Sequence, residues 1–246
     1  MGPGTRFRIG ILCIGIASAT CAPGSAWAIT FDGDLTYTSD YIFRGISQTG
    51  GGSAGQIDLR VTTRDGTFAG VFASTLNRLW HRGNWVTWGW DYQLEEYLGH
   101  RFDLSPAWST TLTAVNYGYL KGNVPLSDDY QEVSVAMSYL DLWTASVSVI
   151  PNAVRFDGGY RLGRYPAYIA DTSAQLPLVG RLFFTAGAGY YTSDETGYAF
   201  GNAGLAFEFK SLRVEAGYYF AQQSARMLFP YGRAGNRFAG TLSWHF

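Results

Sequence analysis

Apolar and polar residues alternate along most of the chain, so that every second residue is apolar. The alternation is clearest in residues 56–61, 86–95, 132–139, 204–209 and 212–220. Such a period of two places successive side chains on opposite faces of an extended strand, whereas a helix would repeat its apolar positions every three or four residues. The pattern therefore predicts β-strands throughout.

The alternating segments predict about twelve strands, within limits of ten and fourteen, each followed by a connection. Their centres lie near residues 40, 59, 71, 91, 112, 135, 146, 169, 186, 204, 216 and 241. The resulting repeat of roughly 18 residues accommodates a tilted membrane strand of about ten residues and one connection.

The connections alternate between short and long. The short ones are predicted at Arg64–Gly66, Gly99–Ser105, Leu140–Leu142, Pro177–Gly180 and Lys210–Ser211. The longer ones are predicted at Gln48–Ala54, Asn77–Asn84, Lys121–Asp129, Pro151–Arg164 and Gln222–Asn236, with a shorter one at Ser193–Tyr198. An even number of strands with every tight turn at one end predicts a single antiparallel transmembrane β-barrel, because a soluble sandwich has no reason for this asymmetry. Prolines are expected only in connections or at strand starts.

The first 28 residues differ from the rest of the chain. Arg6 and Arg8 precede an apolar run, and small residues follow up to Ala28, as in a cleaved secretory signal peptide. We therefore expect a signal peptide at 1–28 and a barrel at 29–246 in the outer membrane. A lipid anchor on Cys21 is the alternative, although Thr20 is larger than the residue that such a cleavage site needs.

Composition narrows the function classes. Aromatic residues make up 17% of the chain and glycine occurs 31 times, which is unusual for a soluble domain. Without Arg6 and Arg8, 16 basic residues face 19 acidic residues, a net charge of −3, and there is no basic stripe of the kind that binds nucleic acid. No nucleic-acid partner is expected.

The C-terminal strand carries a candidate assembly signal. Its apolar face holds Phe238, Leu242, Trp244 and the terminal Phe246. This pattern resembles the signal by which the barrel-assembly machinery recognises outer-membrane barrels. The alternative is that an amphipathic strand simply happens to end in phenylalanine.

One segment, Ser39–Gln48 (SDYIFRGISQ), resembles the N-terminal motif of the TorF-like family of proteobacterial proteins grouped as porins. Similarity to that family also extends over 68–74, 90–99 and 130–133, although the strand with Trp85, Trp88 and Trp90 is richer in aromatics than expected. The resemblance implies an outer-membrane barrel with a transport role, and it implies no substrate, cofactor or catalytic residue.

If the apolar face meets lipid, the polar face lines the lumen. The candidate lumen and pore residues are Asp40, Arg44, Asp58, Arg60, Asp91, Glu95, Glu132, Asp171, Glu208, Arg213 and Glu215. This interior is acidic on balance, and an open lumen would favour cations. A filled lumen with paired, structural charges is the alternative, because about a dozen strands enclose only a narrow space.

The segment 37–44 is expected to continue the first strand, with Asp40 and Arg44 facing inward and Arg44 pairing with Asp58 or another lumen carboxylate. Arginines instead dominate the long loops. The candidates for contact with lipopolysaccharide phosphates are Arg78, Arg82, Arg155, Arg161, Arg164, Arg226 and Arg233.

Catalysis and metal binding have little support in the sequence. The histidines beyond residue 28 are His81, His100 and His245, which are too dispersed for a metal site. The predicted topology places His100 and His245 at the periplasmic end, away from outer-leaflet lipid, and His81 in an outer loop, which favours an interfacial residue over a catalytic base. We therefore expect no enzyme, no cofactor and no metal. The expected function is a porin for small solutes, and the alternative is a structural or adhesive barrel whose loops bind lipopolysaccharide or a surface partner.

Overall fold

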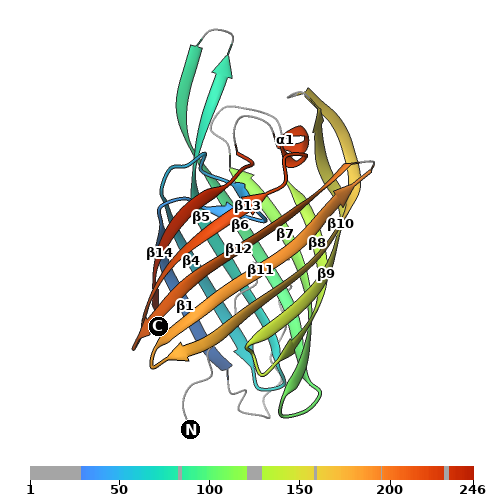
Figure 1. Cartoon of the computed structure of the whole chain (residues 1–246). Coiled ribbons are helices and arrows are strands. Elements are labelled where there is room, and N and C mark those ends of the chain that lie inside the picture. Colours follow the sequence, from blue (N-terminus) through green and yellow to red (C-terminus); the bar gives the residue numbers. More distant parts are fainter. Residues whose placement is uncertain (1–28, 83–84, 121–128, 158–159, 195, 230–232) are drawn as a thin grey trace.

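The computed structural model describes residues 29–82, 85–120, 129–157, 160–194, 196–229 and 233–246. Within these ranges, twelve antiparallel strands form one closed barrel (Figure 1). They are β1 (Ile29–Thr38), β4 (Ala54–Thr63), β5 (Thr67–Arg82), β6 (Trp85–Asp103), β7 (Trp108–Leu120), β8 (Tyr130–Tyr139), β9 (Trp143–Asp157), β10 (Tyr160–Val179), β11 (Leu182–Ser193), β12 (Thr196–Phe209), β13 (Leu212–Ala221) and β14 (Arg237–His245).

Each barrel strand pairs with its neighbours in the chain, and β1 pairs with β14 to close the cylinder. At the seam, the backbone N–H and C=O groups of Gly33 and Phe246 bond to each other over 2.9 and 3.0 Å. Residue 29 and the C-terminus lie at one end, together with the tight turns, and we call this the turn end (Figure 1). The opposite end is the loop end.

The prediction of a twelve-stranded antiparallel barrel is confirmed. The position of the first strand is wrong, because β1 ends at Thr38 instead of being centred near residue 40. Several predicted connections are partly strand. The two longest cases are the loop at 77–84, where β5 ends at Arg82 and β6 begins at Trp85, and the loop at 151–164, where β9 ends at Asp157 and β10 begins at Tyr160. The β5–β6 hairpin consequently projects beyond the rim (Figure 1).

Three prolines lie inside strands, contrary to the prediction. Pro151 lies within β9, and Pro166 and Pro177 lie within β10. The register shifts between Tyr165 and Ala167, where Pro166 stands, and again directly after Pro177. At a bulge one residue leaves the hydrogen-bonded ladder, so the missing N–H of Pro166 costs no ladder bond.

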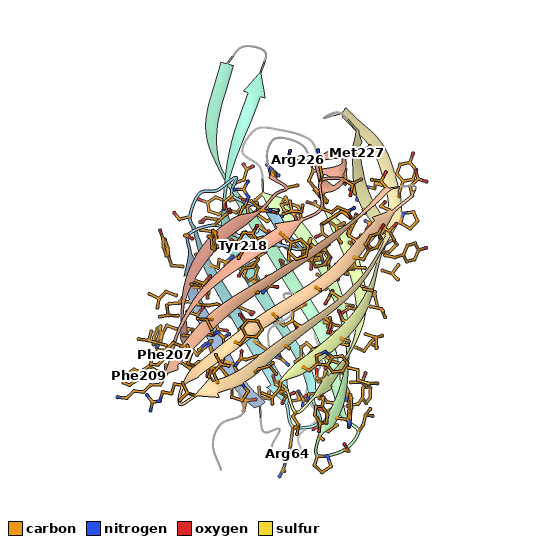
Figure 2. All side chains as sticks on the ribbon, viewed as in Figure 1. Arg64, Phe207, Phe209, Tyr218, Arg226 and Met227 are labelled. Carbon is orange, nitrogen blue, oxygen red and sulfur yellow. The ribbon has the colours of Figure 1, made fainter. Side chains whose placement is uncertain are left out.

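The outer surface of the barrel is apolar. Side chains such as Leu35, Val135 and Leu205 are more than two-fifths exposed, and Figure 2 shows Phe207 and Phe209 pointing away from the wall. Exposed side chains of this kind at every second strand position would be costly in water and are stable against lipid hydrocarbon. The chain is thus a transmembrane β-barrel. No helix among the described residues is long and apolar enough to cross a membrane.

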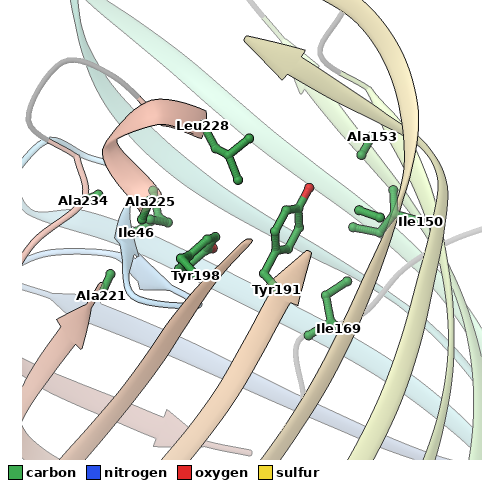
Figure 3. Packing of buried hydrophobic residues seen from close by; sticks show 11 residues of the cluster. Ile46, Ile150, Ala153, Ile169, Tyr191, Tyr198, Ala221, Ala225, Leu228 and Ala234 are labelled. Carbon is green, nitrogen blue, oxygen red and sulfur yellow. The ribbon is translucent and has the colours of Figure 1, made fainter. Parts of the chain in front are cut away.

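The hydrophobic core lies inside the barrel, at the loop end. It brings Ile46, from the segment after β1, together with Tyr191 and Tyr198 from β11 and β12 (Figure 3). The short helix α1 (Ala225–Leu228), between β13 and β14, adds Leu228 from above. The loop-end half of the lumen is therefore packed with side chains.

Candidate functional site

The segment after β1 turns inward instead of continuing the wall. Two short strands, β2 (Ile42–Phe43) and β3 (Ile46–Ser47), pair with each other, and the turn between them consists of Arg44 and Gly45. Both turn residues have positive φ, 51° and 75°. This is the backbone geometry that two-residue hairpin turns favour. We call residues 39–49 the inner hairpin, and the prediction of one continuous strand through Arg44 is wrong.

Asp40 holds the base of the inner hairpin. Its buried carboxylate accepts hydrogen bonds from the hydroxyls of Ser47 (2.5 Å) and Thr49 (2.8 Å), and from the guanidinium of Arg237 on β14 (3.3 Å). The Thr49 hydroxyl in turn accepts the backbone N–H of Tyr41 (3.1 Å). One aspartate thus fixes both strands of the hairpin and ties them to the barrel wall.

The turn of the inner hairpin closely contacts the barrel wall at β12 and β13. A Cβ atom on Gly45 would lie 2.7 Å from the backbone oxygen of Phe220 and 2.9 Å from the Cβ atoms of Phe200 and Ala221. On the other side, Ile46 forms a β-bridge with Ala234 from the connection between β13 and β14. The hairpin is therefore held between the wall and an outer loop.

Arg44 forms the main contact between the hairpin and the far side of the lumen. Its two terminal nitrogens donate to the two carboxylate oxygens of Glu132 on β8, over 2.8 and 2.6 Å. The Arg44 side chain is 11% exposed and that of Glu132 is fully buried. The Tyr198 hydroxyl also donates to the Arg44 backbone oxygen (3.3 Å). This bidentate ion pair spans the barrel interior and narrows it.

Further carboxylates lie around this ion pair, each with a neutral donor. Glu95 accepts a hydrogen bond from Gln93 (2.7 Å), Asp58 accepts one from the Tyr97 hydroxyl (2.6 Å), and Asp171 accepts one from Ser146 (2.9 Å). Asp91 is also buried. The middle of the lumen consequently holds more carboxylates than guanidinium groups.

A polar vestibule occupies the turn-end half of the lumen, with a cavity volume of about 670 Å³. Arg213 bridges Glu208 (2.5 Å) and Glu215 (2.9 Å) on its wall. The guanidinium of Arg60 lies over the ring of Phe68, 3.9 Å from its centroid, and also lines this space. Four sequence-predicted residues thus meet here, whereas Arg44 and Glu132 belong to the constriction above.

A second, smaller cavity lies above the inner hairpin, on the loop side. Its volume is about 130 Å³, and aromatic side chains form much of its wall. They are Phe43, Tyr119, Tyr130, Tyr191, Tyr198 and Phe229. We call this space the aromatic cavity.

These inward-facing aromatics were not predicted from the sequence, because its apolar residues were assigned to the lipid face. The signal was present in strand parity. Tyr117 shares its face of β7 with the buried Thr113, and Tyr191 shares its face of β11 with the buried Thr185. A tyrosine in register with lumen threonines and serines is predicted to face inward too.

The predicted loop arginines lie toward the loop end, in three situations. The side chains of Arg78, Arg82, Arg155 and Arg161 lie outside the described residues. Arg164 donates to the backbone oxygens of Asp129 (2.6 Å) and Asn152 (2.8 Å). Arg226 on α1 is exposed (Figure 2), whereas Arg233 lines the aromatic cavity. A role in binding lipopolysaccharide stays a prediction for all of them.

The histidines described with side chains lie at the turn end. His100 on β6 forms a hydrogen bond with Thr67 (2.9 Å), and His245 pairs with Asp34 across the seam of the barrel. The side chain of His81 lies outside the described residues. The predicted assembly residues occupy one outward face of β14, where Phe238 is 81% exposed and Phe246 is 48% exposed. Their role as an assembly signal stays a prediction.

The sequence model of a bacterial family described as "Bacterial protein of unknown function (Gcw_chp)" matches residues 22–190, which include the inner hairpin and Glu132. The chain belongs to this family. The Gcw_chp match agrees with the expectation of a bacterial family. The name of that family is not TorF, so membership of the TorF-like family stays a prediction. The chain matches none of the curated proteins.

Solved structures with a similar fold include two porins. The structure of the NanC porin in a rhombohedral crystal form has a TM-score of 0.53 and 12% identity, and the match covers 87% of this chain and 98% of that one. The KdgM porin in complex with disordered oligogalacturonate has a TM-score of 0.51 and 7% identity, with coverages of 88% and 98%. At such low identity, these likenesses show that the Gcw_chp chain shares their barrel fold.

Proposed function

We propose that this barrel is a narrow porin of the outer membrane that passes small solutes. The observation that carries the proposal is the polar vestibule of about 670 Å³ inside a closed, lipid-facing barrel. A barrel that served only as a scaffold would gain nothing from an internal polar space of this size. The fold shared with the NanC and KdgM porins supports the same interpretation.

The charges inside favour cations over anions. Asp32, Asp34, Glu208 and Glu215 line the vestibule together with Arg60, Lys210 and Arg213. Asp58 adds a carboxylate near the constriction. Rings of carboxylates lower the barrier for cations and raise it for anions. Small cations and neutral solutes should therefore pass faster than anions of the same size.

The inner hairpin sets the upper limit of solute size. Its ion pair from Arg44 to Glu132 crosses the lumen between the vestibule and the aromatic cavity. A solute has to pass beside this pair or displace it, so solutes larger than a monosaccharide should be excluded. This is the physical difference between the proposed channel and a wide, water-filled porin with many more strands.

A filled, structural barrel is the competing function, and one observation favours it. The inner hairpin is anchored at its base by Asp40 and at its turn by Glu132, as a permanent plug would be. The outer arginines would then bind lipopolysaccharide or a surface partner. Neither alternative needs catalysis, and the assembly of both would use the barrel-assembly machinery.

Liposome swelling distinguishes the two functions. Proteoliposomes that contain the barrel are diluted into graded sugars, and into cationic and anionic solutes of matched size. The porin predicts swelling that falls steeply above the size of a monosaccharide, with cations faster than anions. Swelling no faster than that of protein-free liposomes for every solute would refute the porin and leave the structural barrel.

A further inference from the structure

We propose that the aromatic cavity is a binding site for monocyclic aromatic carboxylates, of which benzoate is the simplest. The site goes beyond the proposed porin function, because it lies on the loop side of the constriction and its occupancy does not depend on passage through the barrel. Size, wall chemistry and charge each point to this ligand class.

The volume fits one six-membered ring. The cavity measures about 130 Å³, and an engineered apolar cavity of about 150 Å³ in another protein holds a benzene molecule. The size thus favours single rings with small substituents.

The walls present aromatic faces from separate strands. Tyr191 and Tyr198 stack with ring centroids 5.4 Å apart, and Phe229 packs edge-on against Tyr198 at 5.9 Å. Figure 3 shows Tyr191 and Tyr198 side by side beneath Leu228. Tyr119 and Tyr130 line the cavity from β7 and β8. Aromatic ligands gain offset-stacked and edge-to-face contacts in such surroundings.

Apart from Gln48 and the tyrosine hydroxyls, the remaining wall is aliphatic, which favours an aromatic ring over a sugar. Ile46, Ile150, Ala153 and Val154 offer no hydrogen-bonding side chain. A sugar acid of the same size carries several hydroxyls, and each one left without a partner in this setting costs free energy. An aromatic ring has no such groups to satisfy.

The charge of the lining selects a carboxylate. Among the described residues that line the cavity are two arginines, Arg44 and Arg233, and no aspartate or glutamate. Arg44 and Arg233 thus give this lining a positive charge, and the planar fork of a guanidinium matches a carboxylate well. We assign the ligand carboxylate to Arg233, which lies near the loop end.

The acidic lumen below the constriction determines from which side an anion reaches this site. An anion that is held above the constriction faces the carboxylates of the lumen and is not drawn further inward. Benzoate should therefore bind from the loop side and hinder ion flow instead of crossing. This behaviour separates the site from a permeation step.

Calorimetric titration of the folded full-length chain in detergent tests the proposal. Benzoate should bind with a stoichiometry of one, whereas benzylamine, which is a cation, and acetate, which lacks the ring, should not. Glucuronate should bind at least tenfold more weakly than benzoate, given the unpaired hydroxyls. Equal binding of benzylamine would overturn the charge argument, and equal or tighter binding of glucuronate would overturn the ring argument.

Two substitutions locate the site. Ala153→Leu fills the cavity and should abolish benzoate binding, and its control Ala136→Leu adds the same volume at a buried lumen position outside the cavity. Arg233→Gln should raise the dissociation constant of benzoate about tenfold, which is typical for the loss of a charge-assisted hydrogen bond. Its control, Arg226→Gln, alters an exposed arginine of the same loop that does not line the cavity.

The outcomes separate this proposal from the porin. Heat-modifiable migration on gels confirms that each variant is folded before titration. Benzoate affinity that is unchanged in both Ala153→Leu and Arg233→Gln would overturn the site. A barrel that binds benzoate but passes no solute would refute only the porin, and a barrel that passes solutes but does not bind benzoate would refute only this site.

Discussion

Arg44 and Glu132 are joined by two parallel hydrogen bonds of 2.8 and 2.6 Å across the barrel interior. The two residues come from different parts of the molecule, because Arg44 stands in the turn of the inner hairpin and Glu132 stands on β8. The pair is nearly inaccessible to water. A buried charge is costly when its partner is removed, so this contact determines whether the hairpin stays in place.

Arg44→Met should destabilise the barrel, because it leaves the carboxylate of Glu132 buried without its cation. We expect the free energy of unfolding to fall by about 3 kcal/mol. The double variant Arg44→Met and Glu132→Met should recover much of this loss, since neither charge is then left alone. Urea unfolding followed by tryptophan fluorescence measures both. Losses that simply add in the double variant would contradict the role of the pair, as would an Arg44→Met variant with unchanged stability and conductance.

Gly45→Ala should push the inner hairpin away from the wall. Alanine would have to adopt the positive φ of 75°, and its Cβ would lie 2.7 to 2.9 Å from atoms of the wall. We expect the free energy of unfolding to fall by about 2 kcal/mol. Gly180→Ala is the control for backbone strain alone, because Gly180 has φ +60° and open space around its missing Cβ. That variant should lose only about 1 kcal/mol. Urea unfolding compares the two, and equal losses would show that contact with the wall contributes nothing.

Strand alternation was sufficient to predict the barrel and failed at the inner hairpin, for a physical reason. Polar and apolar residues alternate in 37–44 as they do in the other strands. This period of two is equally compatible with a β-hairpin and with one continuous strand. The turn depends on Arg44, a residue type without a strong preference for positive φ. The hydrogen bonds that Ser47 and Thr49 donate to Asp40, the ion pair with Glu132 and the bridge between Ile46 and Ala234 hold it there.

The aromatic cavity was hidden from the sequence for a related reason. Strand parity with the buried threonines predicts that single tyrosines such as Tyr191 face inward, but it does not predict that tyrosines of different strands come together. The loop-end tyrosines face inward because the inner hairpin and α1 supply an apolar partner there. That partner is contributed by segments far away in the chain, so no local pattern reveals it.

Asp65 should make the turn between β4 and β5 less stable in acid. Hydroxyl hydrogen bonds from Thr63 and Thr67 lower the pKa of the Asp65 carboxyl below its ordinary value. A lowered pKa in the folded state stabilises the fold at pH values above the unfolded pKa of about 3.9. This contribution is lost as the pH falls through the folded pKa.

Urea unfolding of the wild type and of Asp65→Asn between pH 3 and pH 7 tests this linkage. The wild type should lose stability relative to the variant as the pH drops below about 4. Thr67→Ala, which removes one donor, should reduce the difference. Parallel curves for wild type and Asp65→Asn would show that the turn carboxylate plays no part.

Removal of Phe246 should impair assembly more than stability. Its ring covers Gly33 at the seam, and its backbone pairs with the same residue. If the C-terminal face is an assembly signal, deletion of Phe246 should reduce the folded barrel in the outer membrane several-fold while refolding in detergent still succeeds. Phe209→Ala, which alters another exposed phenylalanine at the turn end, is the control. Similar losses for both variants would contradict a specific signal.

The most direct test of the account is the conductance of single barrels in planar bilayers, measured for the wild type and for a variant in which a short Gly-Ser linker replaces residues 41–48. A narrow porin constricted by the inner hairpin predicts small, discrete, cation-preferring steps for the wild type. The variant should give steps several-fold larger, because the ion pair between Arg44 and Glu132 is gone. Absence of conductance from both proteins, or steps of equal size, would contradict the account.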